Sequence, residues 1–117
     1  MPEPSSGRII SFAEALREAT ELCMTEDCNV VVIGLGVDDP KGIFGTTSGL
    51  LTKFGSSRVI EPPTAENGTA GIAIGAALSG LRPILTHQRV EFALLAMDPL
   101  VNQAAKWHYM TGARQNV

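Results

Sequence analysis

Asn29-Val30-Val31-Val32-Ile33-Gly34 is the stretch that decides the fold. Four β-branched residues follow one another without a polar residue between them, and a glycine ends the run. Continuous runs of this kind are typical of strands that are buried on both faces of a parallel sheet. The sequence therefore predicts a central parallel strand here, and the flanking segments are expected to cover and extend it.

A helix is predicted before this strand. Ser11 is a good N-cap, and Glu14, three positions later, completes a capping box. Apolar residues then recur at helical spacing and predict one buried stripe, made of Phe12, Ala15, Leu16, Ala19, Leu22 and Cys23.

Helices and strands are expected to alternate after the central strand. In order, the segments are a long loop over 35–43, a short helix over 46–54 ended by Gly55, a strand over 58–60, a helix over 67–79, a strand over 82–86 and a helical stretch over 91–110. Pro99 interrupts the last of these, and we expect a kink or a restart there with Asp98 as the N-cap, since proline is tolerated at a first helical position. The alternation predicts a doubly wound, mainly parallel α/β sheet with helices on both faces. Three strands make a narrow sheet with exposed edges, so the fold looks incomplete.

Composition limits the classes of function. A chain of 117 residues that is 44% apolar and 18% charged is typical of one globular domain. The net charge of -3 and the absence of a basic stripe argue against nucleic acid as a partner. No apolar run approaches the roughly 20 residues of a membrane span, which argues against a membrane protein.

The N-terminus and the cysteines indicate a cytoplasmic protein. Residues 1–7 are predicted to be a flexible leader, and they lack the pattern of a signal peptide. Two cysteines suggest no disulfide framework; Cys23 is predicted to be buried on the first helix, and Cys28 is interpreted as an incidental thiol.

Glu66 is the residue best placed for chemistry. It lies where the predicted strand 58–60 passes into the helix 67–79. Turns from strand to helix lie at the carboxyl edge of an open α/β sheet, where ligands bind. The free amides of the first helical turn also favour an anion at that point.

Several other polar or small residues have competing interpretations. Gly68, Gly71 and Gly75 lie on one face of a helix, so they indicate a smooth packing face rather than a phosphate-binding turn. The adjacent Asp38 and Asp39 could form a metal or ribose pair, but a solvated loop explains them better.

Residues after the third strand are the remaining candidates. His87, Gln88 and Arg89 form a polar triplet at the end of a strand, where they could face a ligand, although a lone histidine is more often structural. His108 is interpreted as a helix-surface or interface residue. Phe92 could belong to the core or to the wall of a pocket beside Glu66, and the residues alone favour the core.

The motifs together resemble one family. They are Gly42-Ile-Phe-Gly, Lys53-Phe-Gly-Ser-Ser-Arg-Val, Ala65-Glu-Asn-Gly, Gly75-Ala-Ala-Leu-Ser-Gly-Leu-Arg-Pro, Asp98 and Val101-Asn-Gln-Ala-Ala-Lys-Trp. In this order they resemble the pyrimidine-binding domain in the beta subunit of thiamine-diphosphate-dependent 2-oxoacid dehydrogenases, and more distantly transketolase. The resemblance covers about residues 8–112, and residues 8–117 would be the N-terminal part of that domain.

The resemblance implies roles for individual residues. Glu66 matches the glutamate that hydrogen-bonds a ring nitrogen of the cofactor's aminopyrimidine and so helps the cofactor to lose its thiazolium proton. Phe92 matches the aromatic residue that stacks on the aminopyrimidine, which reverses the preference for the core, and Gln88 falls at a position that lines the same pocket. The helix 68–79 and the helix ending in Lys106-Trp107 resemble elements that pack across subunits. Thiamine diphosphate would be shared with an alpha-type subunit that holds the diphosphate and the magnesium, in a homo- or hetero-oligomer.

This chain departs from the family pattern in three places. Leu35 stands where the family usually has a glutamate, and Pro99 replaces a usual glutamine. The third is that the chain stops at Val117, where the family continues. A Gly-Asp-Gly…Asn motif for magnesium and diphosphate is also absent, and the family keeps this motif on a different domain or subunit. We therefore expect an enzyme part that is inactive without its partner.

Two alternatives stay open from the sequence. One is an orphan domain that acts only as an interaction module; the other is an unrelated small nucleotide-binding α/β protein. The substrate also stays open among pyruvate, branched-chain oxoacids, acetoin and a sugar-biosynthetic oxoacid.

Overall fold

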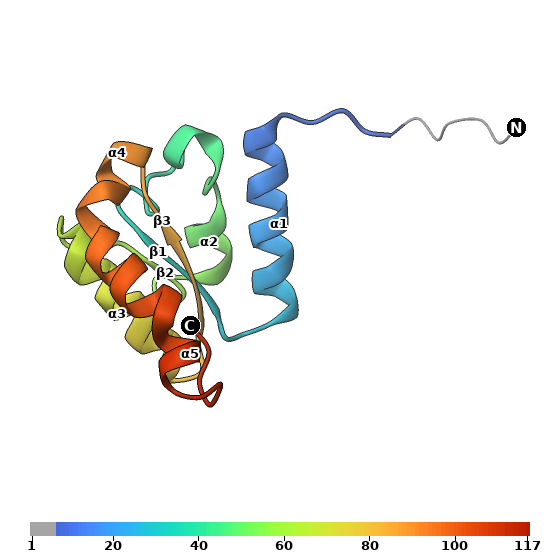
Figure 1. Ribbon diagram of the computed structural model, residues 1–117. Coiled ribbons are helices and arrows are strands. Elements are labelled where there is room, and N and C mark those ends of the chain that lie inside the picture. Colours follow the sequence, from blue (N-terminus) through green and yellow to red (C-terminus); the bar gives the residue numbers. More distant parts are fainter. Residues whose placement is uncertain (1–6) are drawn as a thin grey trace, which may run out of the picture.

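The chain folds around a three-stranded parallel sheet (Figure 1). A computed structural model describes residues 7–117, so residues 1–6 of the predicted leader lie outside the described residues. The strands are β1 (Val30–Gly34), β2 (Val59–Ile60) and β3 (Arg82–Thr86), in the order β2-β1-β3. The parallel α/β sheet that the sequence predicts is confirmed.

Strand β1 is the central strand, and every one of its residues is buried. It pairs with β2 through Val32 and Val59 and with β3 from Val30 opposite Arg82 to Gly34 opposite Thr86. Burial on both faces explains why the run contains no polar residue. The core continues from β1 into neighbouring elements through Met24, Val37, Leu50 and Val59.

The first helix, α1 (Phe12–Glu26), begins at the predicted capping box. Ser11 Oγ accepts from the Glu14 amide at 3.2 Å, and the Ser11 amide donates to Glu14 Oε2 at 2.8 Å. The prediction of a buried stripe is wrong, because Phe12 is 80% exposed and Cys23 is also exposed. Only Met24 of this helix is buried. The spacing of apolar residues predicts that α1 has an apolar face. It does not predict whether another part of the chain packs on that face, and within residues 7–117 most of the face stays uncovered.

The second helix is shorter than the sequence predicts. α2 (Leu50–Phe54) begins four residues later than expected and is preceded by a 3-10 turn, η1 (Ile43–Gly45). Gly49, at the N-cap position of α2, has φ +79°, a left-handed conformation that L-residues rarely adopt. Gly55 also has a positive φ and closes the helix with a bond from its amide to the Leu51 carbonyl.

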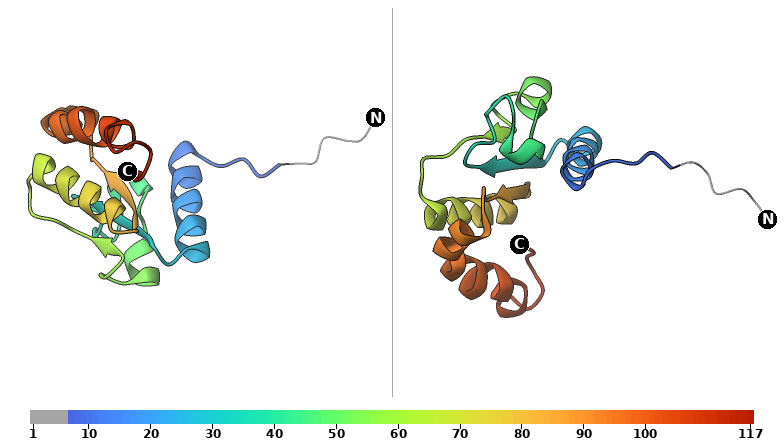
Figure 2. Two further views of the ribbon diagram at one scale, coloured as in Figure 1. Left: turned by 60° about the horizontal axis from the view of Figure 1, so that its bottom comes forward. Right: turned by 90° about the horizontal axis from the view of Figure 1, so that it is seen from above.

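Helices cover both faces of the sheet, as the views in Figure 2 show. α1 and α2 lie on one face, and α3 (Glu66–Leu78) lies on the other. A helical run packs outside α3 and consists of α4 (Val90–Ala93), η2 (Leu94–Ala96), the wide π-helical segment η3 (Pro99–Ala104) and α5 (Ala105–Met110). Strand β3 and helix α3 match their predicted ranges to within one residue.

The predicted break at Pro99 takes a different form. Asp98 stands at the predicted N-cap position, directly before η3, but it has helical φ and ψ of -61° and -58° and its side chain makes no cap bond. The chain instead widens into η3 at buried Pro99, and Asp98 Oδ1 accepts from the Asn102 side chain at 2.8 Å. A π-helical turn accommodates the missing amide of proline without ending the helical run.

Arg58 joins three elements at the amino end of the sheet. Its guanidinium donates to the backbone carbonyls of Met24, Asp27 and Val30 at 2.7 to 3.0 Å. The same group lies 5.1 Å from the ring centroid of Phe54, in cation–π contact. One side chain therefore satisfies carbonyls at the end of α1 and at the start of β1.

Candidate functional site

The carboxyl edge of the sheet brings together segments that are far apart in the sequence. Strand β1 ends at Gly34, β2 at Ile60 and β3 at Thr86. Because the strands are parallel, these three ends meet at one edge, and the chain leaves each of them toward a loop or helix. Open α/β sheets bind ligands at such edges.

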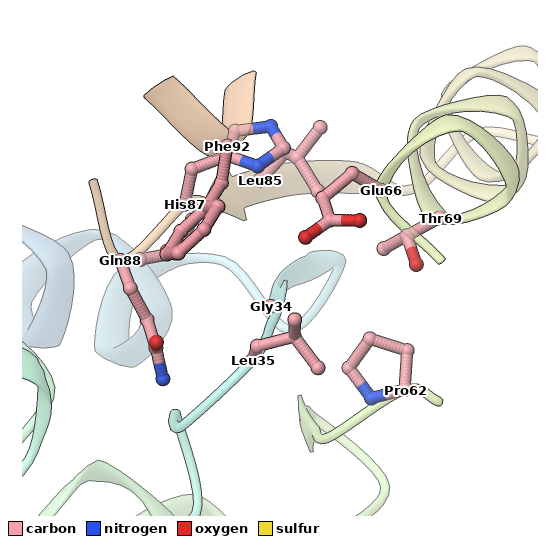
Figure 3. Close-up of a pocket in the computed structure, with 10 residues that line it drawn as sticks. Gly34, Leu35, Pro62, Glu66, Thr69, Leu85, His87, Gln88 and Phe92 are labelled. Carbon is pink, nitrogen blue, oxygen red and sulfur yellow. The ribbon is translucent and has the colours of Figure 1, made fainter. Parts of the chain in front are cut away.

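A pocket opens at this edge (Figure 3). It is lined by Gly34, Leu35, Pro62, Glu66, Thr69, Leu85, Thr86, His87, Gln88 and Phe92. The walls are mainly apolar, and Glu66 and His87 are the only ionisable side chains among the lining residues. An apolar pocket with a few converging polar groups is the usual form of a small-molecule site.

Glu66 enters the pocket from the first position of α3. In Figure 3 its carboxylate points toward the middle of the pocket, above Leu35 and Pro62. The side chain is partly buried, and it takes no part in any of the ion pairs found in residues 7–117. The carboxylate is therefore available to a ligand and is stabilised by the amides of the first helical turn.

Phe92 and Gln88 both line this pocket but are placed differently. Phe92, on α4, is 37% exposed, so the preference for the core that the residues alone gave is wrong. Gln88 directs its amide away from Glu66 in Figure 3. A Cβ atom on Gly36 would lie 2.6 Å from Gln88 Nε2, so this amide lies against the backbone of the 35–43 loop.

His87 contributes a buried nitrogen to the pocket. Its Nε2 atom is excluded from solvent and has no hydrogen-bond partner in the described chain. A buried polar group without a partner costs about 1–3 kcal/mol. Native structures contain few such groups, and each calls for an explanation.

The remaining predicted candidates lie outside the pocket. Asp38 and Asp39 are exposed, and Asp39 Oδ1 accepts from the Lys41 amide at 2.7 Å, which supports the solvated-loop interpretation. His108 is exposed on α5. Gly71 and Gly75 of α3 have open space around them, with no atom within 4 Å of an added Cβ.

Two findings apply to residues 7–117 as a set. No group of three or more His, Cys, Asp or Glu residues in this range is arranged to hold a metal ion. None of the helices in the same range has both the length and the hydropathy that crossing a membrane requires.

The sequence reasoning missed part of the pocket wall. Thr69 follows Glu66 by three residues, and this helical spacing could have identified it as a neighbour on the same face. Pro62 and Leu35 had no such signal, because loop residues meet only through the tertiary fold. Glu61 was also overlooked; its Oε2 accepts from the amide of buried Val37 at 3.0 Å and anchors the 35–43 loop beside the pocket.

Comparison with known proteins agrees with this fold. A family model described as transketolase, pyrimidine binding domain, matches residues 8–117. The pyruvate dehydrogenase E1 component subunit beta of Rickettsia bellii is 48% identical over 105 residues, which are 90% of this chain and 32% of that protein. The mitochondrial subunit of Saccharomyces cerevisiae is 40% identical over 111 residues, 95% of this chain and 30% of that protein.

The same subunit of Bos taurus is 37% identical over 108 residues, which are 92% of this chain and 30% of that protein. The chain thus spans about a third of the length of the curated relatives it matches. With a family match over nearly all its residues, a parallel α/β sheet and a pocket at the carboxyl edge of that sheet, the chain belongs to the transketolase pyrimidine-binding domain family.

Proposed function

We propose that this chain forms the pyrimidine-binding half of a thiamine-diphosphate site in a 2-oxoacid dehydrogenase of the pyruvate dehydrogenase E1 type. The observation that carries the proposal is that Glu66, Phe92 and the end of β3 line one pocket at the carboxyl edge of the sheet. Relatives named as E1 component subunit beta support the reaction class.

The lining residues fit an aminopyrimidine. That ring is flat and apolar on its faces and polar at its edge, and the pocket offers apolar side chains together with two ionisable ones. Unpartnered Nε2 of His87 shows that the pocket has hydrogen-bonding capacity that the chain itself does not use. In this arrangement Phe92 would hold the ring by its face, and Gln88 would close the side toward the 35–43 loop.

Glu66 performs the chemistry that this chain contributes. Its carboxyl group hydrogen-bonds a pyrimidine nitrogen and exchanges a proton with it. When bound, thiamine diphosphate supplies the nucleophilic carbon that attacks the oxoacid. The apolar walls formed by Leu35, Pro62 and Leu85 would limit the access of water to a bound ring and so strengthen the interaction between the carboxyl group and the ring.

A second subunit completes the proposed site. The diphosphate group and its magnesium would be held by an alpha-type subunit, so activity would require both chains. The support is the name of the relatives, which are beta subunits of an E1 component. The assignment of residues 8–117 as the N-terminal part of a pyrimidine-binding domain belongs to the same proposal.

The test uses the complete subunit in complex with its partner, with magnesium and thiamine diphosphate. Glu66→Gln is expected to slow exchange of the cofactor's thiazolium proton for deuterium by about 100-fold or more, because positioned acid–base groups contribute about 10²–10⁴-fold. Proton NMR after acid quench measures the exchange. Glu91→Gln is the matched control, since this exposed carboxylate is one residue from Phe92 but does not line the pocket.

One outcome would contradict the proposed role of Glu66. An exchange rate in Glu66→Gln within threefold of that of the unmodified complex would remove Glu66 from the proposed role. Circular dichroism of both variants shows whether the fold is intact, so a loss of structure is separated from a loss of chemistry.

A further inference from the structure

We propose that His87 is a second polar contact to the aminopyrimidine, made through its Nε2 atom. The proposal rests on the proposed function, because it assigns a further residue to the same pocket. Its starting point is the one buried side-chain nitrogen or oxygen in residues 7–117 that has no hydrogen-bond partner.

The first argument is the position of this nitrogen. His87 follows directly after β3 and lines the pocket together with Leu85, two residues earlier. Successive residues of a strand alternate between faces, so Leu85 and His87 share a face. Figure 3 shows the imidazole on the same side of the pocket as Leu85, with the Glu66 carboxylate also turned into the pocket. An unpartnered nitrogen on a side chain that lines a ligand pocket gains a partner when a polar group of the ligand reaches it.

The second argument is the number of polar atoms that the ligand carries. An aminopyrimidine has two ring nitrogens and an exocyclic amine, and one carboxylate cannot pair with all of them. Atoms left unpaired in an apolar pocket would weaken binding. Gln88 does not fill this role in the structure, because its amide lies against Gly36.

The third argument is chemical. A neutral imidazole presents either an N–H donor or a lone-pair acceptor at Nε2, depending on its tautomer. Nε2 can therefore donate to a ring nitrogen or accept from the exocyclic amine. Among the lining residues, Glu66 and His87 thus form a pair of unlike groups: one carboxylate and one imidazole.

The test measures cofactor affinity by titration calorimetry in the complete subunit bound to its partner, with magnesium present. His87→Leu fills similar space without a polar atom and is expected to weaken thiamine diphosphate binding by about 10-fold. His87→Gln places an amide near the position of Nε2 and is expected to recover most of that loss. Thr20→Val is the matched control, because Thr20 borders a hollow on the α1 side of His87 but does not line the pocket.

A second measurement separates contact from a structural role. The titrations of the unmodified complex and of His87→Leu are repeated with thiamine diphosphate analogues. In one kind of analogue a ring nitrogen is replaced by a C–H group, and in the other the exocyclic amine is replaced by a hydrogen atom. If His87 contacts one of these atoms, His87→Leu is expected to weaken binding of the analogue that lacks that atom at least threefold less than it weakens binding of thiamine diphosphate itself. Should His87→Leu fold poorly, the same comparison is made with His87→Met, which also has no hydrogen-bonding nitrogen at that place.

The outcomes distinguish the two proposals. Equal losses with all analogues, or affinity in His87→Leu within twofold of the unmodified complex, would overturn the role of His87. If Glu66→Gln still slows proton exchange in that case, the proposed function stands without His87. If Glu66→Gln has no effect either, the proposed function itself is wrong.

Discussion

Gly34, the last residue of the central strand, lies close against the edge strand β3. A Cβ atom added to it would lie 2.2 Å from the backbone oxygen of Thr86, its partner in the β1–β3 register. Because that oxygen belongs to the backbone, only a shift of the strand could relieve the clash. At the residue scale, the end of β1 therefore requires a residue without a side chain, at the same edge that carries the pocket.

The first prediction follows from this contact. Gly34→Ala is expected to lower the free energy of unfolding by about 1–3 kcal/mol or more, as overpacked cores do. Gly71→Ala is the matched substitution: it lies inside α3 with no atom within 4 Å of the added Cβ, and it is expected to stabilise by about 0.5–1 kcal/mol. Urea unfolding of the three proteins measures both. Equal stability of Gly34→Ala and the unmodified chain would contradict the proposed close approach.

Glu66 and His87 show how much the sequence alone predicts about single residues of the pocket. Glu66 was recognisable because a carboxylate that follows a strand and opens a helix has a known place in α/β folds. His87 was not, since a histidine after a strand is equally compatible with a structural role. Burial of Nε2 without a partner is the observation that supports the proposed ligand contact, and burial is a property of the whole arrangement.

At the scale of elements, α1 is held to its neighbours partly by charge. Lys53 of α2 donates to Glu21 Oε1 at 2.7 Å, and Arg17 of the same helix as Glu21 donates to Oε2. The bonds from Lys53 and then from Arg17 hold the pKa of Glu21 below its ordinary value. The bond from Lys53 joins α2 to α1. It contributes to docking of α1 because most of the apolar stripe of α1 is not buried.

The second prediction is a pH dependence. A lowered pKa in the folded chain means that the Glu21 contribution is fully present above the unfolded-state pKa, about 4.3, and is lost as the pH falls through the folded-state pKa. Glu21→Gln is therefore expected to reduce stability at neutral pH and to flatten the loss of stability below that value. Urea unfolding at a series of pH values measures the difference.

Glu26→Gln serves as the control, because Glu26 is on the same helix and takes part in none of the ion pairs of residues 7–117. The same acid slope in Glu21→Gln and in the unmodified chain would show that this contact contributes nothing to docking of α1.

Elements differ in how well the sequence located them. The predicted ranges of β1, β3 and α3 match the structure to within one residue, because each is an apolar stretch that ends next to a glycine or a polar residue. α2 was placed too early, since Gly45 and Gly49 turn the backbone with φ near +80° where the apolar pattern already continues. Local turn conformation, which apolar spacing does not record, decided that boundary.

At the scale of the whole molecule, much apolar surface is exposed. Large apolar side chains are exposed on several helices, including Phe12, Leu22, Ile72, Leu94, Leu95 and Met110. Surfaces of this kind commonly mark interaction sites.

The third prediction is association through this surface. Sedimentation velocity of the isolated 117-residue chain is expected to show species heavier than a monomer at micromolar concentration. Ile72→Glu, on the exposed face of α3 where Ile72 is 62% exposed, is expected to shift the distribution toward the monomer. Thr52→Glu, at an exposed position of α2, is the control for an added charge. A purely monomeric unmodified chain would contradict the prediction.

The sequence by itself determined the class of fold and the place of Glu66. β-branched runs, caps and periodic apolar residues are local signals, and together they predict a parallel sheet with helices on both faces. Only the tertiary structure decided which residues share the pocket with Glu66, that the α1 stripe stays exposed and that His87 Nε2 is buried without a partner. The physical reason is that burial and partnering depend on contacts between segments tens of residues apart, whereas periodicity and capping act within one or two helical turns.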